Sequence, residues 1–196
     1  SAFGSSSLYA NNTGSYNTAS GSLALYSNTT GSYNTASGAS ALAANTTGTR
    51  NIAIGYSAYD NADTENDNLA IGYDALGGSI AGGEYNIAIG NYSLDALTTG
   101  DYNTALGYDA LTTSTTGLAN AAVGYRALKN NTTGGSNVAL GNAALAANTT
   151  ASYNTATGYE ALNSNTTASY NTATGYESLS ANTTGENNTA SGYQSL

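Results

Sequence analysis

The sequence predicts an all-β fold, a parallel β-solenoid in which each seventeen-residue repeat forms one coil. Three observations predict this fold. Asparagine recurs every seventeen residues along almost the whole chain. A short alternation of larger and smaller side chains follows each asparagine, as in a half-buried strand. Asn and Gly then mark turns in the rest of the unit. We expect about eleven to twelve coils, a β-roll with roughly two short strands per coil, stacked at about 4.8 Å.

We number the repeat from this asparagine, position 1, to position 17. One interval is eighteen residues long, and we expect its glycine-rich stretch 77–85 to absorb the extra residue as a loop. Residues 60–67 replace the usual Asn-Thr-Thr-Gly and are a second irregularity. We expect one repeat domain over residues 1–196. Because Ser1 stands in mid-repeat, we expect this domain to be a segment of a longer chain or fibre. Position 1 is residues 17, 34, 51, 68, 86, 103, 120, 137, 154, 171 and 188.

The strand that follows position 1 has two unequal faces. Position 3 is always Ala and position 5 is always Gly, so we expect both to face the crowded interior, with the usual Leu of position 9. Positions 2 and 4 then point outward. In the central coils they are aliphatic, and a row of exposed aliphatic side chains implies a partner surface. The candidate interface residues are Ile52, Ile54, Leu69, Ile71, Ile87, Ile89, Val138 and Leu140.

This arrangement predicts self-association, either as a homotrimer or as a head-to-tail filament of stacked coil ends. In the terminal coils, positions 2 and 4 are Thr or Ser instead. The opposite arrangement of the faces would bury these hydroxyl groups, and each would then need a hydrogen-bond partner. A wholly buried aliphatic row would leave the chain no such interface.

The composition argues against several classes of function. The net charge is −9, with three basic residues against twelve acids, so no basic patch is available for nucleic acid. No apolar run approaches the roughly 20 residues of a membrane span. The chain contains no His and no Cys, which are the common acid–base and nucleophilic groups of enzymes. We expect a protein that is not an enzyme and needs no cofactor.

The acidic run in residues 60–67 is the one candidate metal site. Its alternating acids would share a side of an extended segment, and oxygen-rich loops can bind Ca²⁺. The run lacks the glycine and the spacing of an EF-hand loop, so a solvated loop is the alternative. The three candidate ligands are Asp63, Glu65 and Asp67.

Asn-x-Thr sequons recur at position 12 and predict a row of N-linked glycans along the rod. The alternative is that Asn serves there as a turn residue and Thr for its preference for strands. Asn91, Asn130 and Asn187 also begin sequons outside this row. The position-12 candidates are Asn11, Asn28, Asn45, Asn131, Asn148, Asn165 and Asn182.

Two further rows lead to different interpretations. Tyr recurs at positions 6 and 17, where the rings can stack from coil to coil or contact a carbohydrate or a protein. Thr-x-Thr pairs such as Thr155/Thr157, with Thr at position 14, are typical of an ice-binding solenoid face. The aliphatic residues of the central coils interrupt those pairs, so ice binding stays an alternative.

The units that begin at Asn51, Asn86 and Asn137, with Ile-Ala-Ile-Gly or Val-Ala-Leu-Gly after the asparagine, resemble repeats of trimeric autotransporter adhesin heads. The whole unit also resembles repeats of phage tail-fibre-like and bacterial surface proteins. The seventeen-residue unit is longer than the usual adhesin repeat. This resemblance implies a left-handed, trimeric, extracellular fibre or adhesin head on a cell or virion, with surface glycans or host and matrix proteins as partners.

Overall fold

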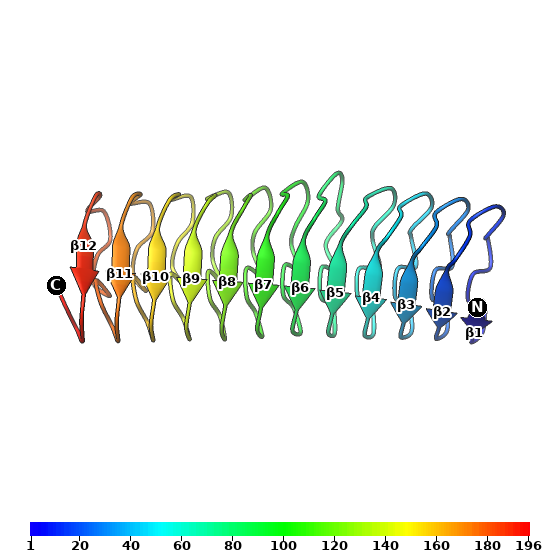
Figure 1. Ribbon diagram of the computed structural model, residues 1–196, viewed down its shortest axis with the longest axis horizontal. Helices are drawn as coiled ribbons and strands as arrows, with labels where there is room; N and C mark the ends of the chain where they lie inside the picture. Colours follow the sequence, from blue (N-terminus) through cyan, green and yellow to red (C-terminus); the bar gives the residue numbers. More distant parts are fainter.

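The computed structural model describes residues 1–196 as a single rod built on one sheet of twelve parallel strands, in chain order (Figure 1). The termini lie at opposite ends of the rod. The predicted β-solenoid is therefore confirmed. The chain contains no helix long and apolar enough to cross a membrane. The strands are β1 (Ala2–Phe3), β2 (Thr18–Ser20), β3 (Thr35–Ser37), β4 (Ile52–Ile54), β5 (Leu69–Ile71), β6 (Ile87–Ile89), β7 (Thr104–Leu106), β8 (Ala121–Val123), β9 (Val138–Leu140), β10 (Thr155–Thr157), β11 (Thr172–Thr174) and β12 (Thr189–Ser191).

Each strand pairs with the same repeat positions of the next coil. Ala53 pairs with Ala70, and Ala156 pairs with Ala173, a seventeen-residue step. The register of β5 and β6 steps by eighteen, with Leu69 opposite Ile87. The extra residue lies in the loop after β5, which rises above its neighbours in Figure 1. The prediction that residues 77–85 absorb the insertion is confirmed.

The expectation of two strands per coil is wrong, because the structure has one, at positions 2–4. The backbone is left-handed at positions 7 and 9, as at Leu23 (φ 62°) and Leu25 (φ 52°). These two left-handed residues interrupt the extended conformation that a second strand would need. Backbone hydrogen bonds still join the coils there, as from Leu25 N to Ala41 O at 3.0 Å. Left-handed backbone costs a non-glycine residue about 1–2 kcal/mol. Burial of Leu25 and this bonding offset that cost.

The interior is thin and partly polar. The alanines of positions 3 and 8 and the leucines of position 9 form one apolar cluster along the rod. Of the 60 buried residues, however, 20 are polar, most of them asparagines of positions 1 and 12. A buried amide without partners is costly, so the hydrogen bonds of these side chains decide whether the core is stable.

The position-1 asparagines form a continuous ladder. Asn103 Oδ1 accepts the backbone N–H of Asn120 at 3.1 Å, and Asn86 Oδ1 accepts that of Asn103 at 2.9 Å. Asn103 Nδ2 donates to the carbonyl of Gly117 at 2.8 Å. The same bond from backbone N–H to Oδ1 recurs at every step from Asn17 to Asn188. Each asparagine within the ladder thus bonds both neighbouring coils, the preceding one through its backbone N–H and the following one through its Oδ1.

Glycine at position 5 is required by both its dihedral angle and its surroundings. Gly55 has φ of +139°, and a Cβ atom there would lie 2.2 Å from the carbonyl oxygen of Gly72 in the next coil. A side chain would strain the turn and push the coils apart. The unvarying glycine therefore permits the close stacking of the coils.

Replacing Asn103 with alanine should lower the free energy of unfolding by about 2–4 kcal/mol, because it leaves the Asn120 N–H and the Gly117 carbonyl buried without partners. Chemical denaturation measures the loss. Asn130→Ala is the control, since Asn130 is exposed; it should change stability by less than about 0.5 kcal/mol. Equal losses in the two variants would contradict the ladder's role.

Candidate functional site

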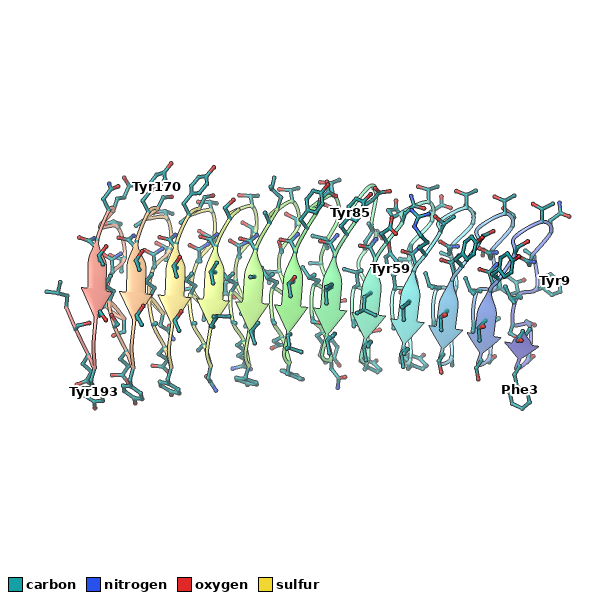
Figure 2. All side chains as sticks on the ribbon, viewed as in Figure 1. Phe3, Tyr9, Tyr59, Tyr85, Tyr170 and Tyr193 are labelled. Carbon is teal, nitrogen blue, oxygen red and sulfur yellow. The ribbon has the colours of Figure 1, made fainter.

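The outer face of the sheet is the main candidate surface. In each full coil the central alanine of the strand is buried and the residues at positions 2 and 4 point outward, at least partly exposed. The prediction of which face points outward is therefore confirmed. Ile52 and Ile54 are each about 40 % exposed. Side chains project from the whole length of this face in Figure 2.

The aliphatic residues of this face form one continuous strip, named here the aliphatic strip. At position 4 it crosses six consecutive coils in register. Leu106 and Val123 complete the row. They were not among the residues predicted from the sequence, because Thr104 and Ala121 at position 2 break the pairing of aliphatic residues at positions 2 and 4. The strip comprises Ile52, Ile54, Leu69, Ile71, Ile87, Ile89, Leu106, Val123, Val138 and Leu140.

The tyrosine rows stack as predicted. Tyr153 and Tyr170 lie with ring centroids 5.1 Å apart and planes inclined by 4°, and Tyr159 and Tyr176 by 5.0 Å and 9°. A third row at position 10 pairs Tyr9 with Tyr26. The rings project from the edges of the rod (Figure 2). Because their faces contact one another, they offer mainly edges and hydroxyl groups to a ligand.

Threonine at position 14 forms the most regular exposed row on the rod. The row crosses all coils except the one that carries the insertion, where Ala81 and Gly82 stand instead. Most of its neighbours at position 13 are partly buried threonines whose hydroxyls bond the next coil, as from Thr132 Oγ1 to the Thr149 carbonyl at 3.0 Å. The exposed row is Thr13, Thr30, Thr47, Thr64, Thr99, Thr116, Thr133, Thr150, Thr167 and Thr184.

The position-12 asparagines point into the core. Asn28, Asn45, Asn131, Asn148 and Asn165 are fully buried, and only Asn11 and Asn182, near the ends, are partly exposed. The Nδ2 atom of all seven donates a hydrogen bond to a carbonyl or to the preceding amide. A glycan on these nitrogens is incompatible with the folded coil, which corrects the expected glycan row. The sequons at Asn91, Asn130 and Asn187 are exposed.

The three candidate calcium ligands do not converge. Asp67 forms a bidentate ion pair with Arg50, with N–O distances of 2.6 and 2.7 Å. Glu65 is buried and accepts the backbone N–H groups of Asp63 and Thr64. The Asp63 carboxylate accepts a hydrogen bond from Thr46. Each carboxylate has its own partner, and nowhere in the chain do three acidic residues form a site for a metal ion.

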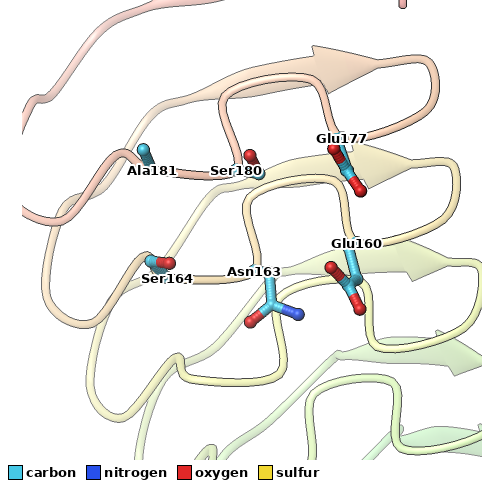
Figure 3. Close-up of a pocket in the computed structure, with 6 residues that line it drawn as sticks. All are labelled: Glu160, Asn163, Ser164, Glu177, Ser180 and Ala181. Carbon is cyan, nitrogen blue, oxygen red and sulfur yellow. The ribbon is translucent and has the colours of Figure 1, made fainter. Parts of the chain in front are cut away.

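An open polar groove of about 510 Å³ lies at positions 7, 10 and 11, between the last two full coils (Figure 3). Glu160 and Glu177, both at position 7, line it one above the other. Gln194 Nε2 donates to Glu177 at 2.8 Å. The remaining lining residues are Asn163, Ser164, Ser180 and Ala181. The groove repeats the ordinary surface of stacked coils rather than enclosing a substrate.

Comparisons with known proteins found no match to a family model, to a curated protein or to a solved structure.

One coil exchanges two core residues. Tyr59 replaces the usual Leu of position 9, and Ala62 replaces the Asn of position 12; both are fully buried. Asn68 Nδ2 donates to the Tyr59 hydroxyl at 2.6 Å, and burial, with Glu65 nearby, raises the Tyr59 pKa well above its usual value. Since Ala62 has no amide, Asn45 Oδ1 lacks a partner. The larger side chain of Tyr59 at position 9 is thus accompanied by the smaller side chain of Ala62 at position 12.

We expect the two residues to be energetically coupled. Tyr59→Leu should cost roughly 2 kcal/mol by leaving a cavity, and Ala62→Asn about 1–3 kcal/mol by overpacking. The double variant should recover much of both losses, because it restores the usual Leu–Asn pair and supplies a donor to Asn45. Thermal or chemical denaturation of the four proteins gives a coupling energy of at least about 1 kcal/mol. Simple additivity would show that the exchange is not compensated.

Acidic residues of positions 7 and 10 interleave across four coils. Burial, followed by the charges of Asp74, Asp60 and Asp109, raises the pKa of Asp95. Burial and Asp74 likewise raise the pKa of Asp60. Asp109 is partly neutralised by Arg126 and Lys129, at 3.5 and 3.3 Å. The folded state therefore binds protons more tightly at Asp95 and Asp60 than the unfolded chain does.

The raised pKa values predict how stability changes with pH. Between neutral pH and the unfolded-state value of about 3.9, protonation of Asp95 and Asp60 favours the folded state, so stability should rise as pH falls through this window. Asp95→Asn should stabilise the rod at pH 7, by up to about 1 kcal/mol, and weaken this pH dependence. Melting temperatures at several pH values measure both effects. Glu186→Gln, an exposed control, should change neither; an Asp95→Asn protein no more stable than its parent at pH 7 would contradict the interpretation.

Proposed function

We propose that this chain is a non-catalytic structural rod, a segment of an extracellular fibre or adhesin head, that assembles with copies of itself through the aliphatic strip. The continuous strip across six coils is the observation that carries the proposal. Its residues lie in register on a sheet of three-residue strands, and Thr or Ser replaces them in β2, β3 and β10 to β12. Phe3, at position 4 of the incomplete first coil, is the one apolar exception. Burying apolar surface of this kind stabilises an assembly by roughly 25 cal/mol per Å².

A homotrimer closed around the strip is the assembly that we favour. Copies of one chain related by rotation bring identical strips together. The Thr and Ser residues of β2, β3 and β10 to β12 stay compatible with water, so the continuous apolar contact is confined to the central coils. The rod itself acts mechanically: bonds between neighbouring coils carry its stability along the axis. Head-to-tail addition of coil ends is the other mode of self-assembly.

The extracellular location rests on the resemblance of the repeats to adhesin-head and tail-fibre-like units. A rod on a cell or virion surface would meet surface glycans and host or matrix proteins. The exposed hydroxyl rows and tyrosine edges are suited to such polar, uncharged ligands. Retention of rod-coated beads on immobilised neutral polysaccharide or matrix protein tests the adhesive part of the proposal. Beads that are retained on neither would leave only a spacer role.

Sedimentation tests the assembly. The native mass should be three times the 19.5 kDa of the chain. The triple variant Ile54→Ser, Ile71→Ser, Ile89→Ser gives the central coils the residue that position 4 carries in β2 and β3, and should be monomeric. Thr99→Ser, Thr116→Ser, Thr133→Ser is the matched control on the exposed threonine row and should keep the native mass. A monomeric parent at all concentrations, or a trimeric Ile-to-Ser variant, would reject assembly through the strip.

Ice binding is a second candidate function, favoured by the exposed threonine row of position 14. The row repeats once per coil, at the regular spacing of parallel strands, about 4.8 Å. Thermal hysteresis of the purified protein tests it. If the row binds ice, hysteresis should appear in the parent and fall sharply in Thr116→Tyr, which places a bulky ring in the middle of the row. Absence of hysteresis in the parent would exclude this function.

A further inference from the structure

Sixteen of the seventeen tyrosines are in contact with another tyrosine of a neighbouring coil, and only Tyr59 is not. Eight of these contacts are parallel stacks. At position 17, Tyr16 and Tyr33 have centroids 5.0 Å apart, and Tyr153 and Tyr170 have centroids 5.1 Å apart. Stacking alone explains ring pairs, but it does not require that the phenol edges be open to solvent.

These stacked rings are nevertheless well exposed. Tyr153 and Tyr170 are each 57 % exposed. Both residues have the same left-handed backbone, with φ of 61°, and their ring planes are inclined by only 4°, so the two rings lie one over the other across the step between coils. This stacking holds the ortho carbons of the two phenols, next to their hydroxyls, close to one another. Because the side chains are exposed, they can tilt to bring these carbons together.

The composition directs oxidation to the tyrosines. The chain has no Cys, Met, Trp or His, the other side chains that oxidants commonly attack. The single buried tyrosine, Tyr59, is closed to an external oxidant. Any one-electron oxidant that reaches the rod therefore acts on phenols that are already paired.

We propose that the stacked tyrosine pairs are sites of oxidative cross-linking, in which a peroxidase-type oxidant joins adjacent coils by dityrosine bonds. Each phenol of a pair loses one electron and one proton to the oxidant. A carbon–carbon bond then forms between the two ortho carbons, and each ring regains aromaticity as its ortho hydrogen leaves that carbon and the hydroxyl is restored. The pair loses two hydrogens in total, and one hydrogen peroxide is reduced to two waters.

Such bonds would fasten one coil to the next without cysteine. A bond between Tyr153 and Tyr170 closes a loop of one repeat and opposes fraying of the coils at the C-terminal end of the rod. This role adds to the proposed assembly and does not depend on it, because both phenols belong to one chain.

Hydrogen peroxide with a haem peroxidase tests the proposal on the full chain. A glutamate-specific protease cuts after Glu160 and Glu177, which separates the peptide of Tyr153 from that of Tyr170. Tyr159→Phe is used as the parent, because it removes the phenol of the neighbouring stack that would join the same two peptides. After oxidation, we expect these peptides to be joined, lighter by two hydrogens, in protein that still has the mass of one chain under denaturing conditions.

Adding Tyr153→Phe should abolish the joined peptide, since phenylalanine keeps the stacked ring but has no phenol. Oxidation in denaturant should lower its yield on the order of tenfold, because the stack no longer holds the rings at a high effective concentration. The proposal is overturned if the peptides are joined only in chains of doubled mass, if Tyr153→Phe leaves the joined peptide unchanged, or if denatured and folded chains give equal yields.

Discussion

The amide of the position-1 asparagine is the interaction on which the rest of the structure depends. Its oxygen accepts the backbone N–H of the next asparagine, and its nitrogen donates to the position-15 carbonyl of its own coil, as from Asn103 to Gly117. A coil of only seventeen residues encloses too little apolar surface to be stable alone. The ladder allows a polar side chain to fill this thin interior, and it fixes the spacing at which alanine, leucine and tyrosine rows then pack.

Other features of the repeat follow from this close spacing. Glycine at position 5 leaves room for the carbonyl of the next coil, and left-handed residues at positions 7 and 9 close the coil within seventeen residues. The coil of Tyr59 and Ala62 indicates that the interior has a fixed volume. Where the side chain at position 9 is larger than usual, the side chain at position 12 is smaller than usual. The same stacking also lines up unlike side chains in separate rows along the rod: an aliphatic face, stacked phenols and an exposed threonine row.

Much of the fold could be predicted from the sequence, because the copies within one chain report which positions are equivalent. The unvarying Ala of position 3 indicated the inner face, and the interval between Asn68 and Asn86 located the insertion. The unvarying Gly of position 5 was expected to face the interior as well, but it is only partly buried and makes room for the next coil. The number of strands could not be predicted, since the left-handed conformation of Leu25 is imposed by contacts with other coils and not by the preference of leucine. The sequon of Asn28 was misleading because a buried amide ladder and a glycan acceptor use the same residues. Leu106 was missed because a threonine at position 2 precedes it.

Native-state hydrogen exchange of the position-1 amides tests the central role of the ladder most directly. If the ladder holds the coils together, the backbone N–H groups from Asn34 to Asn171 should be among the slowest to exchange, with protection declining towards both ends of the rod. If these amides exchange as quickly as that of Gly82, in the exposed insertion loop, the coils are not held by the ladder and this account of the structure is wrong.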